Sequence, residues 1–199
     1  MDVSAHNGEI DWQAVAADGY SFAMIRVGYR GYTEGNLYID RNFYQNIEGA
    51  QAAGLSVGVY FFSQAITVDE AVEEAQLALQ ALEGYSIDYP VVFDWEPISG
   101  ATARTDELDT DTLCACAAAF CRTVEAAGYR GMIYFYPHIT EERYDLSRLT
   151  EFDFWYANYK ELDDIGYPVH MWQYTSAGTV AGMKGEVDLN CCFVRYGKR

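Results

Sequence analysis

Hydrophobic residues in this chain gather into short runs, and segments with helical spacing separate many of these runs. Apolar runs rich in β-branched residues are typical of strands that are buried on both faces. The helical segments end at glycines such as Gly54 and Gly128, and one begins at the capping box from Thr67 to Glu70. This alternation predicts strands and helices in turn over most of the chain.

The elements can be placed by residue number. We expect strands at Asp2 to Ser4, Phe22 to Val27, Leu55 to Phe62, Val91 to Trp95 and Gly131 to Tyr136. Helices are expected at Ile10 to Ala17, Asp40 to Ala53, Thr67 to Leu82 and Thr110 to Ala127, and the second strand leads into Gly28 to Gly31. Helical spacing then fades. Three further strands are predicted at Phe152 to Ala157, Val169 to Tyr174 and Val187 to Cys192, with at most a short helix from Asp145 to Leu149.

Strands that alternate with helices imply a parallel sheet with right-handed crossovers. Eight strands in one chain fit a closed barrel, here without helices in its last part. The active site of such a barrel lies at the C-terminal ends of its strands. No internal linker or repeat is visible, so we expect residues 1–199 to form one α/β domain.

The stretch from Tyr89 to Pro97 contains the most informative pattern in the chain. An apolar run between two prolines ends in Asp94 and Glu96, whose spacing places both side chains on one side of a strand, with Cα atoms about 6.6 Å apart. Burying carboxylates is costly, and two neighbouring acids push their pKa values apart. One protonated acid beside one carboxylate is the pair that cleavage of a glycosidic bond requires. The alternative is an acid-rich loop with both side chains in water.

Other polar and aromatic residues fall in or at the ends of predicted strands. Asp2 lies in the first strand and Asp188 in the last, which are neighbours in a closed barrel, so these two acids are expected to converge. Six more candidates for the wall of the cavity are Tyr60, Tyr134, Tyr136, Trp155, Trp172 and Gln173. Together they predict an acidic cavity with aromatic walls, although each aromatic side chain is also suited to filling a core.

Composition narrows the classes of ligand. The formal charge of −17 argues against nucleic acid and against electrostatic docking on anionic membranes. No apolar run approaches the ~20 residues that span a bilayer. No signal peptide precedes the first strand, and we interpret Met1 as an added start. The five cysteines are odd in number and two are adjacent, so we interpret them as buried small hydrophobes, not as disulfides or metal ligands.

Several motifs occur in an order that resembles glycoside hydrolase family 25, the Chalaropsis-type lysozymes, which are N-acetylmuramidases. The motifs are Asp2-Val-Ser4, Gly8-x-Ile10-Asp11-Trp12, Phe93-Asp94-Trp95-Glu96, Trp155-x-Ala157-x-Tyr159, Trp172-Gln173-Tyr174 and Val187-Asp188-x-Asn190. The resemblance spans essentially the whole chain.

This resemblance implies an irregular, flattened TIM-like barrel of about five βα units followed by three strands. It implies hydrolysis of the β-1,4 bond between N-acetylmuramic acid and N-acetylglucosamine, with Glu96 as general acid and Asp94, Asp2 and Asp188 in the same pocket. Tyr60 and Tyr134 match pocket tyrosines of the family. No metal or cofactor is needed. The expected partner is bacterial peptidoglycan, and the expected protein is a monomer that is secreted, associated with the cell wall, or a phage lysin.

Two other functions remain open. A chitinase-like endo-N-acetylglucosaminidase also uses paired acids, but it usually carries a longer acidic run on the fourth strand, and Val91 to Phe93 contains no acid. A non-catalytic glycan-binding module is the second alternative, and the presence of all four acids speaks against it. The nucleophile is undecided between a carboxylate, water and the N-acetyl oxygen of the substrate, with Asp94 orienting the amide in the last case.

Overall fold

The structure, a computed structural model, describes residues 1–197 apart from the side chains of residues 140 and 141. Its strands are β1 (Asp2–Val3), β2 (Phe22–Arg30), β3 (Leu37–Ile39), β4 (Ser56–Ser63), β5 (Val91–Trp95), β6 (Gly131–Phe135), β7 (Asp153–Ala157), β8 (Met171–Gly178) and β9 (Val187–Cys192). The helices are α1 (Trp12–Ala17), α2 (Phe43–Ala52), α3 (Val68–Ala81), α4 (Thr110–Ala126) and α5 (Pro137–Glu142), with short 3₁₀ turns η1 (Ala5–Asn7) and η2 (Leu146–Arg148).

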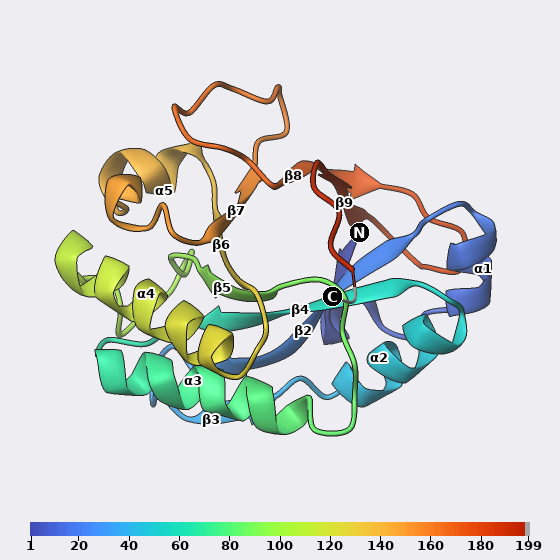
Figure 1. Ribbon diagram of the computed structural model, residues 1–199, viewed down its shortest axis with the longest axis horizontal. Coiled ribbons are helices and arrows are strands. Elements are labelled where there is room, and N and C mark those ends of the chain that lie inside the picture. Colours follow the sequence, from blue (N-terminus) through green and yellow to red (C-terminus); the bar gives the residue numbers. More distant parts are fainter. Residues whose placement is uncertain (198–199) are drawn as a thin grey trace.

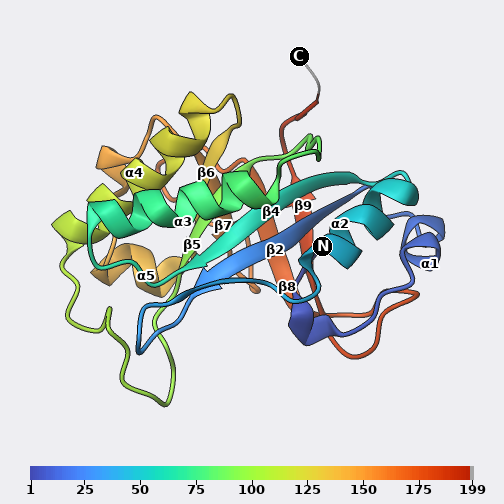
Figure 2. The same ribbon diagram turned by 90° about the horizontal axis from the view of Figure 1, so that it is seen from below.

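The described strands form one sheet in the order β1-β9-β8-β7-β6-β5-β4-β2-β3, and a further pairing of β1 with β2 closes it into a barrel. From β1 through β2 and β4 to β8 neighbouring strands are parallel, whereas β9 is antiparallel to both β8 and β1. Figures 1 and 2 show α3 and α4 side by side over the sheet, while β8 and β9 carry no helix. The expected irregular TIM-like barrel is confirmed, including the contact between first and last strands.

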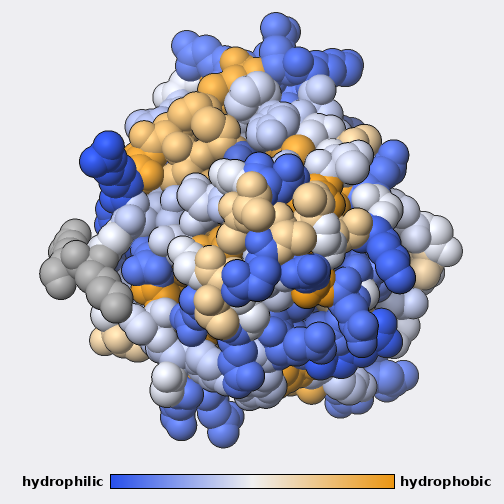
Figure 3. Space-filling view, turned by 90° about the vertical axis from the view of Figure 1, so that its right-hand side faces the viewer, coloured by the Kyte–Doolittle hydropathy of each residue, from blue (hydrophilic) through white to orange (hydrophobic). Residues whose placement is uncertain are grey.

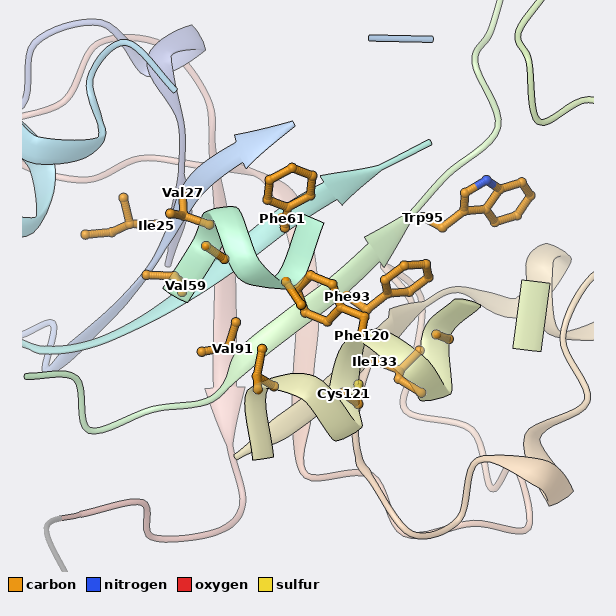
Figure 4. Close-up of a cluster of buried hydrophobic side chains, with 14 of the residues drawn as sticks. Ile25, Val27, Val59, Phe61, Val91, Phe93, Trp95, Phe120, Cys121 and Ile133 are labelled. Carbon is orange, nitrogen blue, oxygen red and sulfur yellow. The ribbon is translucent and has the colours of Figure 1, made fainter. Parts of the chain in front are cut away.

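Alternation along β5 separates two cores. Val91, Phe93 and Trp95 face the helices, where Phe93 and Phe61 both pack against Phe120 with ring centroids 5.5 Å and 6.3 Å apart. Figure 4 shows these rings gathered between the strands and the helices. Val92 belongs to a smaller cluster inside the barrel with Met24, Met132, Tyr134 and Trp155. Asp94 follows the same alternation as Val92, so it points toward the inside of the barrel.

The first half of the barrel departs from prediction at Gly28. β2 continues past its predicted end at Val27 to Arg30, and the short β3, which the sequence pattern did not predict, pairs with its last residues. A Cβ at Gly28 would lie 2.5 Å from the carbonyl oxygen of Tyr38 and 2.9 Å from the ring of Phe61. Glycine is therefore needed here for close approach inside a strand, next to a register shift between Arg26 and Gly28.

Two further departures lie at helix ends. The predicted box at the start of α3 is only half formed: the Thr67 hydroxyl accepts from the Glu70 amide at 3.2 Å, but the Glu70 carboxylate accepts from the Ile66 amide at 2.8 Å. The short α5, with Pro137 at its start, was not predicted because six residues are too few to show helical periodicity.

The surface carries the strong acidic excess of the sequence. Figure 3 shows the face on the side of α1, where apolar side chains lie scattered among hydrophilic ones. Within the described part of the chain, no helix has the length and apolar character required to cross a bilayer.

Candidate active site

The end of β5 presents the central pair of acids. All five residues of β5 are buried, and its neighbours β4 and β6 place Phe62 and Tyr134 on either side of Asp94. Glu96 follows directly after the strand, and Trp95 between the acids is fully buried on the helix side, 4.7 Å from the guanidinium carbon of Arg143 to the ring centroid. The predicted placement of both acids on one side of the strand is thus observed, and the indole of Trp95 lies on the other side.

A cavity of about 450 Å³ opens above these acids. Its acidic lining residues are Asp2, Asp94, Glu96, Glu186 and Asp188. Its aromatic lining residues are Tyr60, Phe62, Tyr134, Trp155 and Tyr159, and Arg26, His6 and Gln173 also contribute polar groups. The structure therefore brings together all four acids that the sequence singled out.

Asp2 is held by a chain of hydrogen bonds from β8 and β9, the strands that follow β1 in the sheet order. Its Oδ2 accepts from Gln173 Nε2 at 2.9 Å and from Asn190 Nδ2 at 2.7 Å. Gln173 Oε1 in turn accepts from the hydroxyls of Tyr134 at 3.0 Å and Tyr159 at 2.9 Å. These bonds fix one wall of the cavity around a buried carboxylate.

Asp94 and Glu96 are restrained differently. Asp94 is 5% exposed, and its Oδ1 has no hydrogen-bond partner among the described residues. The Glu96 backbone carbonyl accepts from the side chain of the fully buried Gln64 at 2.9 Å, and Gln64 accepts from the Thr105 hydroxyl at 2.8 Å. The backbone of Glu96 is therefore fixed while its carboxylate faces the cavity.

The electrostatics of the cavity favour retention of protons. Burial raises the pKa of Asp94 well above its ordinary value, and the charges of Glu96 and Asp2 raise it further. Burial and the charge of Asp2 raise the pKa of Glu96 to about 7. Burial and the charges of Asp2 and Glu96 likewise raise the pKa of Asp188 to about 7. The charge that raises the pKa of Glu96 is thus that of Asp2 and not that of its sequence neighbour Asp94.

Arg26 is a cavity residue that sequence reasoning missed. It lies inside the apolar run of β2, and its Nε and Nη2 both contact Oδ2 of Asp40 at 2.7 Å. Asp40 is 1% exposed and also accepts from the Ala5 amide at 3.1 Å. An arginine within an apolar strand was the available signal, but its partner lies in a different segment and could not be identified from spacing.

A second hollow of about 430 Å³ adjoins Glu96 on its other side. It shares Glu96, Tyr134 and Tyr159 with the cavity and is otherwise lined by Tyr136, Pro137, Ala157, Asn158 and Lys160. Tyr136, predicted as a wall residue, thus lies in this adjoining hollow. Glu96 stands where the two spaces meet.

Among the predicted wall residues, Trp172 is placed elsewhere. Gln173 faces the cavity, and consecutive side chains of a strand point to opposite faces, so Trp172 cannot share that wall. Its indole donates to the Asn158 carbonyl at 2.9 Å, and its ring lies 5.7 Å from that of Tyr174. Tyr60, Tyr134, Trp155 and Gln173 are cavity residues as expected. Tyr159, a motif residue that was not predicted as part of the wall, also lines the cavity, and Asn190 supports it by donating to Asp2 and accepting from Trp155.

The cysteines stand apart from the site. Cys114, Cys116 and Cys121 are buried, whereas Cys191 is exposed and Cys192 is half-buried, and all five are free thiols. The prediction of buried small hydrophobes therefore holds for α4 and is wrong for Cys191. Among the described side chains, no group of three or more His, Cys, Asp or Glu residues is arranged to hold a metal ion.

Comparison with known proteins gives several matches. The sequence model of the Glycosyl hydrolases family 25 matches residues 1–183. The uncharacterized protein YegX of Escherichia coli (strain K12) is 26% identical, and the match covers 96% of this chain and 67% of YegX. The structure of the bacterial lysozyme from Streptomyces coelicolor superposes with a TM-score of 0.79 at 25% identity, covering 98% of this chain and 91% of that one.

The modular autolysin LytC from Streptococcus pneumoniae, solved in complex with a synthetic peptidoglycan ligand, gives a TM-score of 0.80 at 27% identity. That match covers 96% of this chain but 45% of LytC, so the chain corresponds to one part of that longer protein. The family match extends from β1 to β8 and so includes Asp2, Asp94 and Glu96. This chain belongs to glycosyl hydrolase family 25.

Proposed function

We propose that this protein is a lysozyme that hydrolyses the β-1,4 bond between N-acetylmuramic acid and N-acetylglucosamine in bacterial peptidoglycan. The observation that carries the proposal is Glu96, an acid with a pKa near 7 at the junction of an acidic cavity and a second hollow. Names of similar proteins support the substrate class: the matched Streptomyces coelicolor protein is a lysozyme, and LytC was solved with a peptidoglycan ligand.

In this proposal Glu96 is the general acid. With a pKa of about 7 it retains a proton in a substantial fraction of molecules near neutral pH and gives it to the oxygen of the leaving sugar. The sugar that keeps the anomeric carbon occupies the cavity, and the leaving sugar occupies the hollow beyond Glu96. Positive charge then develops on the anomeric carbon beside Asp2 and Asp188, which stabilise it.

The attacking group is the acetamido oxygen of the substrate itself. Asp94 has an oxygen without a protein partner, and that oxygen accepts the amide N–H of the sugar, which turns the carbonyl oxygen toward the anomeric carbon. Water then opens the cyclic intermediate, with Glu96 accepting its proton. All of these steps use side chains of the cavity alone.

Digestion of purified peptidoglycan tests this function, with the new chain ends identified by mass spectrometry. Reducing ends on muramic acid support it. Reducing ends on glucosamine indicate an endo-N-acetylglucosaminidase instead, and retained binding without cleavage indicates a glycan-binding module. Glu96→Gln serves as the control, because products that persist at the same rate in this variant come from another enzyme. An enzyme of this kind acts outside the cell membrane, as a secreted, wall-associated or phage protein.

A further inference from the structure

A third hollow, of about 670 Å³, lies next to the cavity at the C-terminal end of β2. The two spaces share His6, Arg26 and Phe62 in their linings, so they adjoin at these side chains. The hollow is bounded by η1, by the β2–β3 hairpin and by the end of β4. The hydrolysis proposed above does not require it.

The charge of this hollow is opposite to that of the chain. The sequence has 30 acids against 13 Lys and Arg. The described lining of the hollow nevertheless contains Arg26, Arg30, Arg41 and His6, and Asp40 is the single acid in it. Such an inversion next to an acidic cavity favours anionic ligands at this one place.

The three arginines differ in how many of their N–H donors are free of a protein acceptor. Arg30 is 4% exposed and already donates to Glu74, to the carbonyls of Gly35 and Glu70, and to Glu73, so it supports the fold. Arg26 uses Nε and Nη2 on Asp40, and its Nη1 has no acceptor among the described residues. Arg41 is exposed and donates only from Nη2, to the Ala5 carbonyl at 3.3 Å. Two arginines therefore keep donors free for a ligand.

Asp40 fixes Arg26 directly and is linked to Arg41 only through Ala5. Its buried Oδ2 holds both the guanidinium of Arg26 and the Ala5 amide, and Ala5 in turn accepts from Arg41. A guanidinium that is already oriented loses less conformational entropy when it binds a carboxylate. The hollow is thus preorganised on its cationic side.

Tyrosines form the remaining wall. Tyr29 and Tyr38 stack with ring centroids 5.1 Å apart, and Arg26 lies over Tyr29 at 5.3 Å from its centroid. Tyr32 and Tyr38 are 41% and 45% exposed, which leaves their rings open to a ligand. Exposed aromatic rings beside oriented guanidinium groups suit a short peptide that carries carboxylates.

We propose that this hollow binds the acidic stem peptide that branches from the muramic acid bound in the cavity. The proposal rests on the proposed function, because that sugar carries a short peptide with free carboxylates. The sugar in the cavity lies beside Arg26, from which the branch enters the hollow, and Arg26 Nη1 and Arg41 bind its carboxylates. The acidic cavity then binds the sugar, and the cationic hollow binds the anionic stem peptide.

Cleavage of two matched substrates tests this. One is a soluble, uncross-linked peptidoglycan glycan with its stem peptides intact; the other is the same material with the peptide carboxylates converted to amides. We expect wild-type protein to have a higher kcat/KM on the acidic form. In Arg41→Glu the ratio of the two kcat/KM values should fall by about 3- to 10-fold, which is the scale expected of exposed ion pairs that are lost and reversed.

Arg122→Glu is the matched control, since Arg122 on α4 is 64% exposed and neither it nor its ion-pair partner Glu151 lines the hollow. It should leave the ratio unchanged. A ratio near one in the wild type, or the same ratio in Arg41→Glu and wild type, overturns the proposal. Circular dichroism verifies folding, and Arg41→Gln replaces Arg41→Glu if the charge reversal unfolds the protein.

Binding separates this proposal from the proposed function. Isothermal titration of the acidic and amidated glycans into Glu96→Gln measures recognition without cleavage. Preference for the acidic form that Arg41→Glu removes supports the peptide site even if the wild type cuts neither glycan. Equal affinity for the two forms overturns it even if muramidase activity is found.

Discussion

Acidic side chains are enclosed both on the helix side of the barrel and in the cavity. The two regions differ in whether each acid has a cationic partner. On the helix side, Arg30 Nε lies 2.8 Å from Glu74, and Arg104 lies 2.6 Å from Glu70. In the cavity, the four acids lie mainly beside one another. Burial tends to raise the pKa of Glu70, but the Ile66 amide and Arg104 outweigh it, and the pKa is lowered. The pKa of Asp94, without such partners, is strongly raised.

This difference separates structural acids from reactive ones. A carboxylate with a dedicated cation is stable in its charged form and has no proton to donate. A carboxylate among other carboxylates holds a proton near neutral pH and is available for acid catalysis. Glu74 is intermediate, because its complete burial raises its pKa to about 7 despite Arg30. Substitutions in both regions therefore test whether pairing decides the role.

The largest effect is expected from removing the proton of Glu96. Glu96→Gln keeps the shape of the side chain but cannot act as an acid, so turnover on peptidoglycan should fall by about 10²- to 10⁴-fold. Glu70→Gln, the matched change in the paired region, should leave turnover within a few-fold of the wild type. Steady-state rates of reducing-end release check both, and equal losses in the two variants would contradict the comparison.

The next largest effect is expected on stability when the buried cation Arg30 is removed. Arg30→Met leaves Glu74 enclosed without its partner, and breaking such a pair costs about 3–5 kcal/mol in the free energy of unfolding. The double variant Arg30→Met/Glu74→Leu should recover most of this loss, because no buried charge remains. Urea denaturation measures both. A single variant as stable as the wild type would show that this pair does not stabilise the fold.

Removal of a cavity acid should increase the free energy of unfolding, whereas removal of the buried cation decreases it. The pKa of Glu96 is higher in the folded protein than in the unfolded chain, so the unfolded chain loses its proton first as the pH rises. Wild-type stability should thus fall between about pH 4.5 and pH 7. Glu96→Gln should be more stable than the wild type by roughly 1–3 kcal/mol at pH 8, and this gain should vanish near pH 4. Thermal unfolding at the two pH values checks the sign.

The smallest effect is a displacement of the pH–rate profile. Because the charge of Asp2 raises the pKa of Glu96, Asp2→Asn should move the alkaline limb of the profile to lower pH. Asp94→Asn should move that limb less, since burial and the charge of Asp2, not that of Asp94, raise the pKa of Glu96. Profiles of kcat against pH for the two variants show whether the charge of Asp2 or that of Asp94 has the larger effect on the pKa of Glu96. A larger displacement in Asp94→Asn would assign the dominant charge to Asp94.

The sequence predicted those parts of the molecule that depend on local pattern. The apolar run of β5 and the spacing of Asp94 and Glu96 carry their own signal, as does the pairing of first and last strands in a barrel. The extension of β2 could not be predicted, because Gly28 is a turn signal that here serves close packing of Phe61 and Tyr38. In the site, strand alternation shows that Trp172 and Gln173 cannot both face the cavity. Alternation alone does not identify which of the two faces it.

The role of Arg26 lay beyond sequence for a different reason. The orientation of Arg26 depends on its ion pair with Asp40. Asp40 lies close to Arg26 only because β3 runs back antiparallel to β2. The same holds for Gln64, whose bond to the Glu96 backbone crosses between two loops. Local spacing identifies the groups that perform chemistry more readily than the groups that hold them, because the latter act across contacts between distant segments.

The hydrogen bonds of Asp2 have a consequence for how the protein is made. They join residues 171 and 188 positions apart, so they form only when β8 and β9 have been synthesised and have closed the barrel against β1. A nascent chain that ends before β9 contains Glu96 and Asp94 but has no completed wall around Asp2. Partial products of translation, and fragments left by a protease that removes β9, should therefore lack activity. Complementary fragments should regain it only when they reassociate across this seam.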